Sequence, residues 1–263
     1  MFKSLLRESR IAEYLDNSVH LVYIVHCLVN IKKRKDIMRQ SQKMKNIFSD
    51  KATIVPRKML QNPKKKWVVR DFTGLDGVSL GMAQSVLEAM ARKGYVERIK
   101  RGPDSHTVLT NKDMLITDWL RGYQFELNTV DSYYSTDKKV LEKAKGLLRE
   151  KQYALTLHTG ANLTTSFVKT DEIYLYLQLV DWDKEVLDLR QKLDLKELVR
   201  GGNFHIVRPY YKNSVFFNRQ KIKGFAVVSN LQLYLDLYHF QPRGRDHAEY
   251  LKRILEEKGK RLD

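Results

Sequence analysis

The stretch from Trp67 to Thr110 constrains the fold of this chain more than any other part of the sequence. Its middle holds apolar residues at steps of three and four, the spacing that gives a helix one buried face: Ala83, Val86, Leu87 and Met90. Ser79 has a side chain that helix N-caps favour, and Gly94 lies where a C-cap takes positive φ. We therefore predict a capped, amphipathic helix between these two residues.

A β-hairpin is predicted directly after this helix. Residues 95–99 begin a strand, Arg101–Asp104 contains the Gly-Pro pair of a turn, and residues 107–110 form the returning strand. A helix followed by such a hairpin is the arrangement of a recognition helix and its wing in DNA-binding proteins.

The residues before the helix complete this pattern. Val69–Leu75 are predicted to form a support helix, and Asp76–Val78 the turn that joins it to the next helix. An earlier helix would be capped by Ser49 or Asp50 and end at Asn62, because a proline follows that residue. Together these elements predict a winged helix-turn-helix.

The outward side of the second helix supplies the expected base contacts. The N-terminal part of a recognition helix enters the major groove, and the outward residues there are Ser79, Gly81, Met82, Gln84 and Ser85. Gln84 is the expected base-reading residue, because its amide can bond adenine at two atoms. Ser85 would bond a base or a phosphate, and Met82 either packs on a thymine methyl or is partly buried. Glu88 is expected at the rim.

Cations around this helix are the expected phosphate contacts. The first two turns contain no arginine, which lowers the expected specificity for guanine and shifts affinity onto Lys64, Lys65, Lys66, Arg70, Arg92, Lys93, Lys100 and Arg101. Lys100 and Arg101 on the hairpin are the foremost candidates, and His106 would also reach phosphate. The alternative for each lysine is an ordinary solvated charge.

The charge of the chain is consistent with a polyanionic partner. The net charge is +17, and residues 1–130 carry 24 basic and 13 acidic residues (+11) against 24 and 18 (+6) in residues 131–263. The excess therefore lies in the half with the predicted helix-turn-helix. Basic charge attracts phosphate without sequence information, and alone it would also suit RNA or an anionic membrane.

We divide the chain into an N-terminal helical extension (1–48), a winged helix-turn-helix domain (49–125) and a C-terminal mixed α/β domain (126–263). The expected fold class is α/β in the wider sense that includes α+β. The third segment predicts helices over 139–151, 186–193, 231–240 and 246–255, a turn into a short helix at 159–163, and strands over 153–157, 173–180, 204–209, 215–217 and 222–228.

The extension suggests neither a membrane span nor a disulfide. Its most apolar run, Val19–Val29, is shorter than the roughly 20 residues that cross a bilayer, so it is expected to be a buried helix or strand. The basic run Ile31–Lys45 is a solvated helix face or linker, or else an arm on DNA; we favour the first. Cys27 is the only cysteine, which fits a reducing cytosol. We predict a cytoplasmic protein without metal or cofactor.

An enzymatic alternative concerns two carboxylates. A nucleotidyltransferase needs a Gly-Ser turn and two or three carboxylates on adjacent strands to hold magnesium. Asp181 and Asp183 follow a predicted strand, but no third carboxylate accompanies them, and Thr159–Asn162 has a glycine without the serine. We therefore predict no catalytic residues, with a nucleotidyltransferase-like enzyme as the alternative. A third possibility is a winged unit that contacts protein.

Several segments of the sequence resemble one family. They are KKWVVRDFTGLDGVSLGMAQSVLEAMARKGYVERI, LITDWLRGY, YALTLHTGAN, GGNFHIVRPY and GFAVVSNLQLYLDLYHFQPRGRDHAEYL. From about residue 48 to 255 the chain resembles the AbiEi family, which comprises antitoxins of type IV toxin–antitoxin systems and related transcriptional regulators. The last segment is the most specific, and residues 1–47 match nothing.

This resemblance implies a division of labour. The N-terminal domain would bind double-stranded operator DNA and repress its own operon. The C-terminal domain would oppose a nucleotidyltransferase toxin without forming a stable complex with it. Arg243, Arg245 and Glu249 match the terminal motif, either as a structural ion-pair cluster or as a partner surface. Winged regulators often dimerise, so a homodimer is expected although no interface can be named.

Overall fold

The computed structural model describes residues 46–74, 77–150, 152–260 and 262. The predictions for the N-terminal extension up to residue 45, among them Cys27, Val19–Val29 and Ile31–Lys45, lie outside the described residues. Leu75 and Asp76 of the predicted support helix and turn also lie outside them. No helix in the described part of the chain is long and apolar enough to span a membrane.

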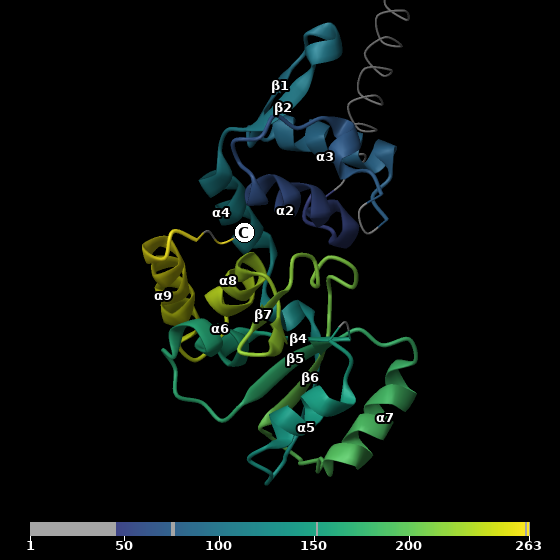
Figure 1. Cartoon of the computed structure of the whole chain (residues 1–263), viewed down its shortest axis with the longest axis vertical. Helices are drawn as coiled ribbons and strands as arrows, with labels where there is room; N and C mark the ends of the chain where they lie inside the picture. The colour runs from purple at the N-terminus through teal and green to yellow at the C-terminus, as the bar shows by residue number, and fades with distance from the viewer. Residues whose placement is uncertain (1–45, 75–76, 151, 261, 263) are drawn as a thin grey trace, which may run out of the picture. The chain divides into compact units, whose positions relative to one another are not determined.

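The first part of the described chain folds into short helices and one hairpin (Figure 1). Its elements, with 3-10 helices marked η, are η1 (Asp50–Thr53), α2 (Ile54–Gln61), η2 (Val69–Phe72), α3 (Leu80–Arg92), β1 (Val96–Ile99), η3 (Gly102–Asp104), β2 (His106–Leu109), α4 (Lys112–Gly122) and η4 (Phe125–Leu127). Strands β1 and β2 pair antiparallel, with Val96 opposite Leu109. The predicted hairpin is therefore present.

Helix α3 begins and ends where its sequence predicts. The Ser79 hydroxyl accepts a hydrogen bond from the Met82 amide at 3.2 Å and caps the first turn. The predicted apolar face is fully buried: Ala83, Val86, Leu87 and Met90. After the last turn Gly94 takes φ +77°, and the Tyr95 amide donates to the Met90 carbonyl at 3.0 Å. These predictions are confirmed. They could be made from the sequence because side-chain capping and a left-handed C-cap act within a few residues.

The segment before α3 differs from the prediction. Instead of a helix over Val69–Leu75, the chain forms the single 3-10 turn η2, which ends at Phe72. The Phe72 ring is fully buried and stacks on Trp67, with 5.1 Å between ring centroids. Gly74 then takes φ +78°, a backbone conformation that cannot continue a right-handed helix. The predicted support helix is therefore wrong in length and type.

The second part is built on one sheet. Its strands are β3 (Thr129–Tyr133), β4 (Tyr153–Leu155), β5 (Ile173–Leu177), β6 (Phe204–Arg208), β7 (Gln220–Ile222) and β8 (Phe225–Val227), in the order β3-β6-β5-β4-β8-β7. β5 runs parallel to β6 and β4 parallel to β8, whereas the other neighbours are antiparallel. The central strands β4 and β5 are buried on both faces, as expected for a sheet covered by helices on both sides.

Helices cover both faces of this sheet. They are α5 (Val140–Leu147), α6 (Leu157–Thr165), α7 (Trp182–Leu193), α8 (Asn230–Tyr238) and α9 (Gly244–Glu257). Figure 1 shows α6, α8 and α9 on one side and α5 and α7 on the other. The protein is thus of mixed α/β class, in agreement with the α+β expectation.

Several strand predictions in this part need correction. The strand predicted over 222–228 is instead the hairpin of β7 and β8, with Gly224 at φ +82° in the turn between them. Val215–Phe217 forms a hydrogen-bonded turn, in which the Val215 amide donates to the Tyr211 carbonyl at 3.1 Å. Strand β4 stops at Leu155, because Leu157 takes φ +48° and begins α6. Strand β3 was missed, since its mixed sequence TVDSY lacks the apolar character of the inner strands.

Buried hydrogen bonds join the two parts of the described chain. The hydroxyls of Thr53 and Ser214 share a bond of 2.7 Å, and the Trp119 indole donates to the Tyr211 hydroxyl at 3.0 Å. Asn46–Asp263 accordingly make up one compact unit. The boundary placed between residues 125 and 126 stays a prediction.

Candidate nucleic-acid interface

Helix α3 exposes one stripe of its surface. Gly81 and Arg92 are exposed, and Gln84, Ser85 and Glu88 between them are half-buried. Because these positions recur every three or four residues, they share the side of the helix opposite its apolar face. The stripe contains the predicted base-contacting residues Gly81, Gln84 and Ser85.

The other two candidates at the start of α3 have partners within the protein. Ser79 is exposed, and its hydroxyl caps the helix by accepting from the Met82 amide. Met82 is half-buried and packs against the core. Ser85 donates to the Gly81 carbonyl at 2.8 Å, one turn back. The neighbouring Leu80 side chain is 54% exposed, so an apolar group that was not among the candidates lies at the tip of the stripe.

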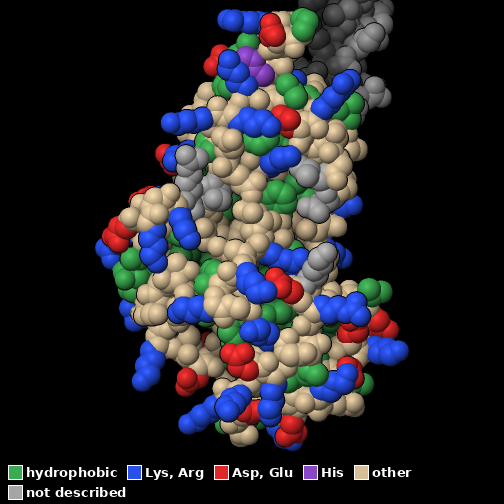
Figure 2. Space-filling view, viewed as in Figure 1, with side chains coloured by type: hydrophobic (Ala, Val, Ile, Leu, Met, Phe, Trp, Pro, Cys, Tyr) green, Lys and Arg blue, Asp and Glu red, His purple; other side chains and the backbone are tan. Residues whose placement is uncertain are grey.

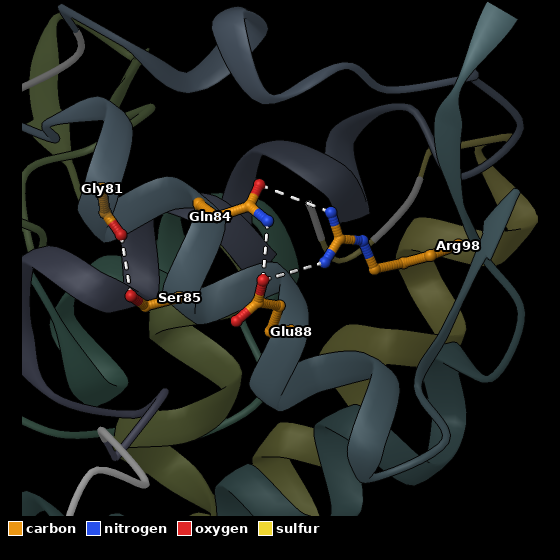
Figure 3. A network of polar contacts seen from close by, with 5 residues as sticks. All are labelled: Gly81, Gln84, Ser85, Glu88 and Arg98. Carbon is orange, nitrogen blue, oxygen red and sulfur yellow. Dashed lines mark hydrogen bonds and ion pairs between the residues drawn. The ribbon is translucent and has the colours of Figure 1, made fainter. Parts of the chain in front are cut away.

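Gln84 belongs to a polar network that Figure 3 shows from close by. Its amide nitrogen donates to the Glu88 carboxylate at 2.6 Å. The guanidinium of Arg98 lies 3.4 Å from both the Glu88 carboxylate and the Gln84 amide oxygen. Both polar atoms of the Gln84 amide are therefore engaged, and each keeps one hydrogen-bonding position for a further partner.

Arg98 is the residue that sequence reasoning missed. It lies on β1, outside the helix, and its side chain extends from the strand to the stripe of α3 (Figure 3). The alternation of side chains along a strand could have revealed it. Val96, two residues earlier, is buried, and side chains two apart in a strand point to the same side, so Arg98 points toward the helix. The first two turns of α3 contain no arginine, and Arg98 of the neighbouring strand places one beside them.

The predicted phosphate-contacting cations are mostly exposed. Lys64, Lys66, Arg70, Arg92, Lys93, Lys100 and Arg101 are all exposed, and Figure 2 shows Lys and Arg side chains projecting from the surface of the part that carries the hairpin. Lys65 is half-buried. Its amine lies 3.4 Å from the Asp71 carboxylate and 4.4 Å from the centre of the Trp67 ring. Lys65 is therefore the member of this set that is already paired.

Backbone pairing brings two groups of these cations to the same hairpin. Trp67, directly after the three lysines, exchanges two hydrogen bonds with Thr107 of β2, at 2.9 and 2.7 Å. Thr107 lies opposite Arg98, one residue from the end of the ladder at Ile99 and His106. The lysines therefore precede a pairing near the same end of the hairpin as Lys100 and Arg101. His106 Nδ1 donates to the Asp104 carbonyl at 2.7 Å, since a carbonyl only accepts, and this leaves Nε2 directed away from that bond.

Arg243, Arg245 and Glu249 each contact an aromatic side chain. The Arg243 guanidinium lies 5.0 Å from the centre of the Phe167 ring, and that of Arg245 lies 5.1 Å from the Tyr238 ring. Glu249 accepts a 2.8 Å hydrogen bond from the Tyr234 hydroxyl. No ion pair joins the three among the described residues, and all three are exposed.

The two carboxylates of the enzymatic alternative lie at the start of a helix. Asp181 is the N-cap of α7, and its carboxylate accepts from the Lys184 amide at 3.3 Å. Asp183 lies in the first turn of the same helix, where a negative charge is favourable near the amide groups. No group of three His, Cys, Asp or Glu side chains within the described ranges is arranged to hold a metal ion.

The glycine of Thr159–Asn162 has a packing role. It lies inside α6, and a Cβ added to Gly160 would come within 2.9 Å of the Leu233 side chain and 3.0 Å of the Leu155 carbonyl oxygen. Gly160 is thus needed for the close approach of α6 to its neighbours. This glycine does not form a phosphate-binding turn, because it is covered by protein.

Comparison with known proteins gives one match. The model of a family described as "Transcriptional regulator, AbiEi antitoxin, Type IV TA system" matches residues 108–257, which is more than half of the chain. No curated protein and no solved structure shows a significant match. The matched region begins within β2, so α3 and β1 lie outside it.

Proposed function

The chain belongs to the AbiEi family of transcriptional regulators, antitoxins of type IV toxin–antitoxin systems, and we propose that it binds the operator of its own operon. The single observation that carries this proposal is the polar stripe of α3, flanked by exposed cations on the adjoining hairpin. In this proposal the protein represses its operon, and this activity requires a location in the cytoplasm.

The DNA-binding unit in this proposal is a winged helix-turn-helix. Helix α3 is the recognition helix, the β1–β2 hairpin is the wing, and α2 with η2 supports them. A recognition helix must expose polar groups along one side while its other side is fixed in a core. The buried apolar face and the exposed stripe of α3 meet both requirements.

Phosphate contacts supply most of the affinity in this proposal. The lysines that precede Trp67, together with Lys100 and Arg101, carry exposed positive charge beside the hairpin. Each phosphate that they neutralise releases counterions, so binding weakens steeply as salt is added. Gln84 and Ser85 then contact bases from within the groove, as predicted from the sequence.

The antitoxin activity is assigned to residues 126–263. We propose that this part counteracts a nucleotidyltransferase toxin encoded beside it, and that two copies of the chain act together on the operator. The supporting observation is that the family match covers the sheet and the helices α5 to α9. Growth of cells that express the neighbouring toxin tests this role, since the full chain should restore growth.

Gel-shift titration at several salt concentrations tests the DNA-binding proposal. The probes are the promoter DNA of the operon and a random duplex of equal length. Arg101→Ala should weaken binding to both probes and reduce the salt dependence by about one phosphate contact. Lys184→Ala is the matched control, because Lys184 is an exposed cation on α7. A salt-independent affinity would instead favour a winged unit that contacts protein.

A further inference from the structure

Arg98 and Glu88 place a hydrogen-bond donor beside an acceptor on the exposed side of α3. The guanidinium and the carboxylate lie 3.4 Å apart, and their side chains are 22% and 44% exposed. Arg98 comes from β1 and Glu88 from α3, so the pair spans the junction of helix and hairpin (Figure 3).

This pair is complementary to one base pair. In the major groove, guanine offers two acceptors, N7 and O6, and cytosine offers the N4 amino donor beside them. Arginine bonds the two guanine atoms with its planar fork, and a carboxylate accepts from cytosine N4. We infer that Arg98 and Glu88 together read a G·C base pair, with Arg98 on guanine and Glu88 on cytosine. This inference rests on the proposed DNA-binding function.

The contact between the two side chains is weak enough to open. A distance of 3.4 Å exceeds the roughly 2.7–2.9 Å of a strong charge-assisted hydrogen bond, and ion pairs with exposed members contribute little to stability. The fold of α3 does not depend on it, because the helix is held by its buried face and its Ser79 cap. The guanidinium can therefore exchange Glu88 for guanine at small cost.

The pairing also explains how a carboxylate can lie in a DNA-binding surface. Glu88 alone would repel the phosphates, whereas Arg98 beside it cancels that charge. Gln84 holds the two groups in place, since its amide nitrogen donates to Glu88 and its oxygen accepts from Arg98. In the free protein Gln84 is thus a positioning residue for the pair.

Selection from a random duplex library, followed by sequencing of the bound DNA, tests the inference with the full chain. The wild type should select a site with an invariant G·C pair. Arg98→Lys keeps the charge but lacks the fork, so its ratio of affinities for the selected site and for random DNA should fall roughly tenfold to hundredfold. Glu88→Gln should relax the choice between G·C and A·T at that position.

Arg92→Ala is the control variant on the same helix. Arg92 is exposed in the last turn, so its loss should weaken binding to all sequences equally and leave the selected site unchanged. Thermal unfolding midpoints of all variants should stay close to that of the wild type. If Arg98→Lys selects the wild-type site with undiminished preference, the inference is overturned and the DNA-binding proposal stands. If the wild type binds no DNA, both are overturned.

Discussion

Arg57 and Asp236 are two buried charged residues that are joined through the side-chain amide of Gln232. Arg57 is 2% exposed and Asp236 is 0% exposed. Arg57 donates to the Gln232 amide oxygen at 2.6 Å, and the Gln232 amide nitrogen donates to Asp236 at 2.7 Å. Arg57 lies on α2 and the other two on α8, so this bridge ties the helix that packs against α3 to the C-terminal helices.

Aromatic groups complete the surroundings of both charges. The Arg57 guanidinium lies 5.0 Å from the centre of the Trp119 ring. Asp236 accepts from the hydroxyls of Tyr123 and Tyr176 at 2.7 and 3.2 Å. Burial raises the pKa of the Asp236 carboxyl to about 6, although its hydrogen-bond donors lower it. The carboxyl is thus ionised at neutral pH and balances the charge of Arg57.

We predict that Arg57 and Asp236 stabilise the protein only as a pair. Asp236→Asn leaves the buried guanidinium of Arg57 without a negative counter-charge. Arg57→Met leaves the buried carboxylate of Asp236 without a positive counter-charge. Each change should lower the free energy of unfolding by roughly 3–5 kcal/mol. The double variant should lose clearly less than the sum, as measured by urea unfolding. Additive losses would show that the two charges do not interact through Gln232.

His158 and His247 form a second pair of buried polar side chains. Their Nδ1 atoms lie 2.8 Å apart, and His158 Nε2 lies 3.2 Å from the Pro242 carbonyl oxygen. Since a carbonyl only accepts, the neutral His158 carries its proton on Nε2 and accepts at Nδ1 from His247. His247 Nε2 lies 2.7 Å from the Thr165 hydroxyl, which itself donates to the Ala161 carbonyl at 2.9 Å.

This arrangement predicts that stability falls with acid. Burial lowers the pKa of His247 to about 4, so between that pH and the ordinary value of 6.5 the unfolded chain binds a proton that the folded protein excludes. The loss in unfolding free energy is about 1.4 kcal/mol per pH unit within this window. Above pH 6.5 the contribution of neutral His247 to the unfolding free energy is fully present.

Urea unfolding of wild type and His247→Phe across pH 4.5 to 7.5 measures this effect. The readout is the slope of the unfolding free energy against pH. The absolute value is not used, because the substitution also removes the hydrogen-bond partner of His158 and so changes stability at every pH. The variant should keep part of the slope, since burial lowers the pKa of His205 to about 4 as well. Asp236, with its raised pKa, acts in the opposite direction in both proteins. An unchanged slope would contradict the assignment to His247.

The sequence predicted those features whose causes are local. Ser79 caps α3 and Gly94 ends it, because both signals act within one helical turn. The failure at Phe72 has a tertiary cause, because its buried ring stacks on Trp67, which is itself held by backbone hydrogen bonds to Thr107 of β2. In Val215–Phe217 the first two side chains are buried and Phe217 is partly buried, all three in a turn. Apolar character alone does not distinguish such a turn from a strand.

In the candidate interface, too, the features with local causes were predicted and those that depend on tertiary packing were not. The stripe of α3 follows from helical periodicity and was predicted. The contacts of Arg98 with Gln84 and Glu88 depend on how β1 packs against α3, which no local pattern specifies. The sequence predicts low specificity for guanine because the first two turns of α3 contain no arginine. That prediction takes only the helix into account and leaves out Arg98 on β1.

Gln84→Ala is predicted to lower the specificity ratio between operator and random DNA by about tenfold. Two possible causes of this loss differ in the operator base pair at which specificity falls. If Gln84 bonds adenine, the loss falls on an A·T position of the operator; if it only positions Arg98 and Glu88, the loss falls on a G·C position. Gel-shift titrations with single base-pair changes measure this, and an unchanged ratio would remove Gln84 from the interface.

The last prediction concerns the exposed residues at the start of α9. Arg245 is the second residue of that helix, and its guanidinium lies 5.1 Å from the centre of the Tyr238 ring. Arg245→Glu places a negative charge at a helix N-terminus, where it is favourable, so we expect the variant to fold. Loss of toxin neutralisation by a folded Arg245→Glu protein would then identify a partner surface.

Gly244 provides the structural comparison for that experiment. A Cβ at this position would overlap the Leu237 carbonyl oxygen, so Gly244→Ala should disrupt the packing of α9 on α8 and lose soluble protein. Circular dichroism and growth of toxin-expressing cells should therefore separate the two variants. If Arg245→Glu unfolds in the same way as Gly244→Ala, Arg245 has a structural role; if it folds and neutralises the toxin fully, the partner surface lies elsewhere.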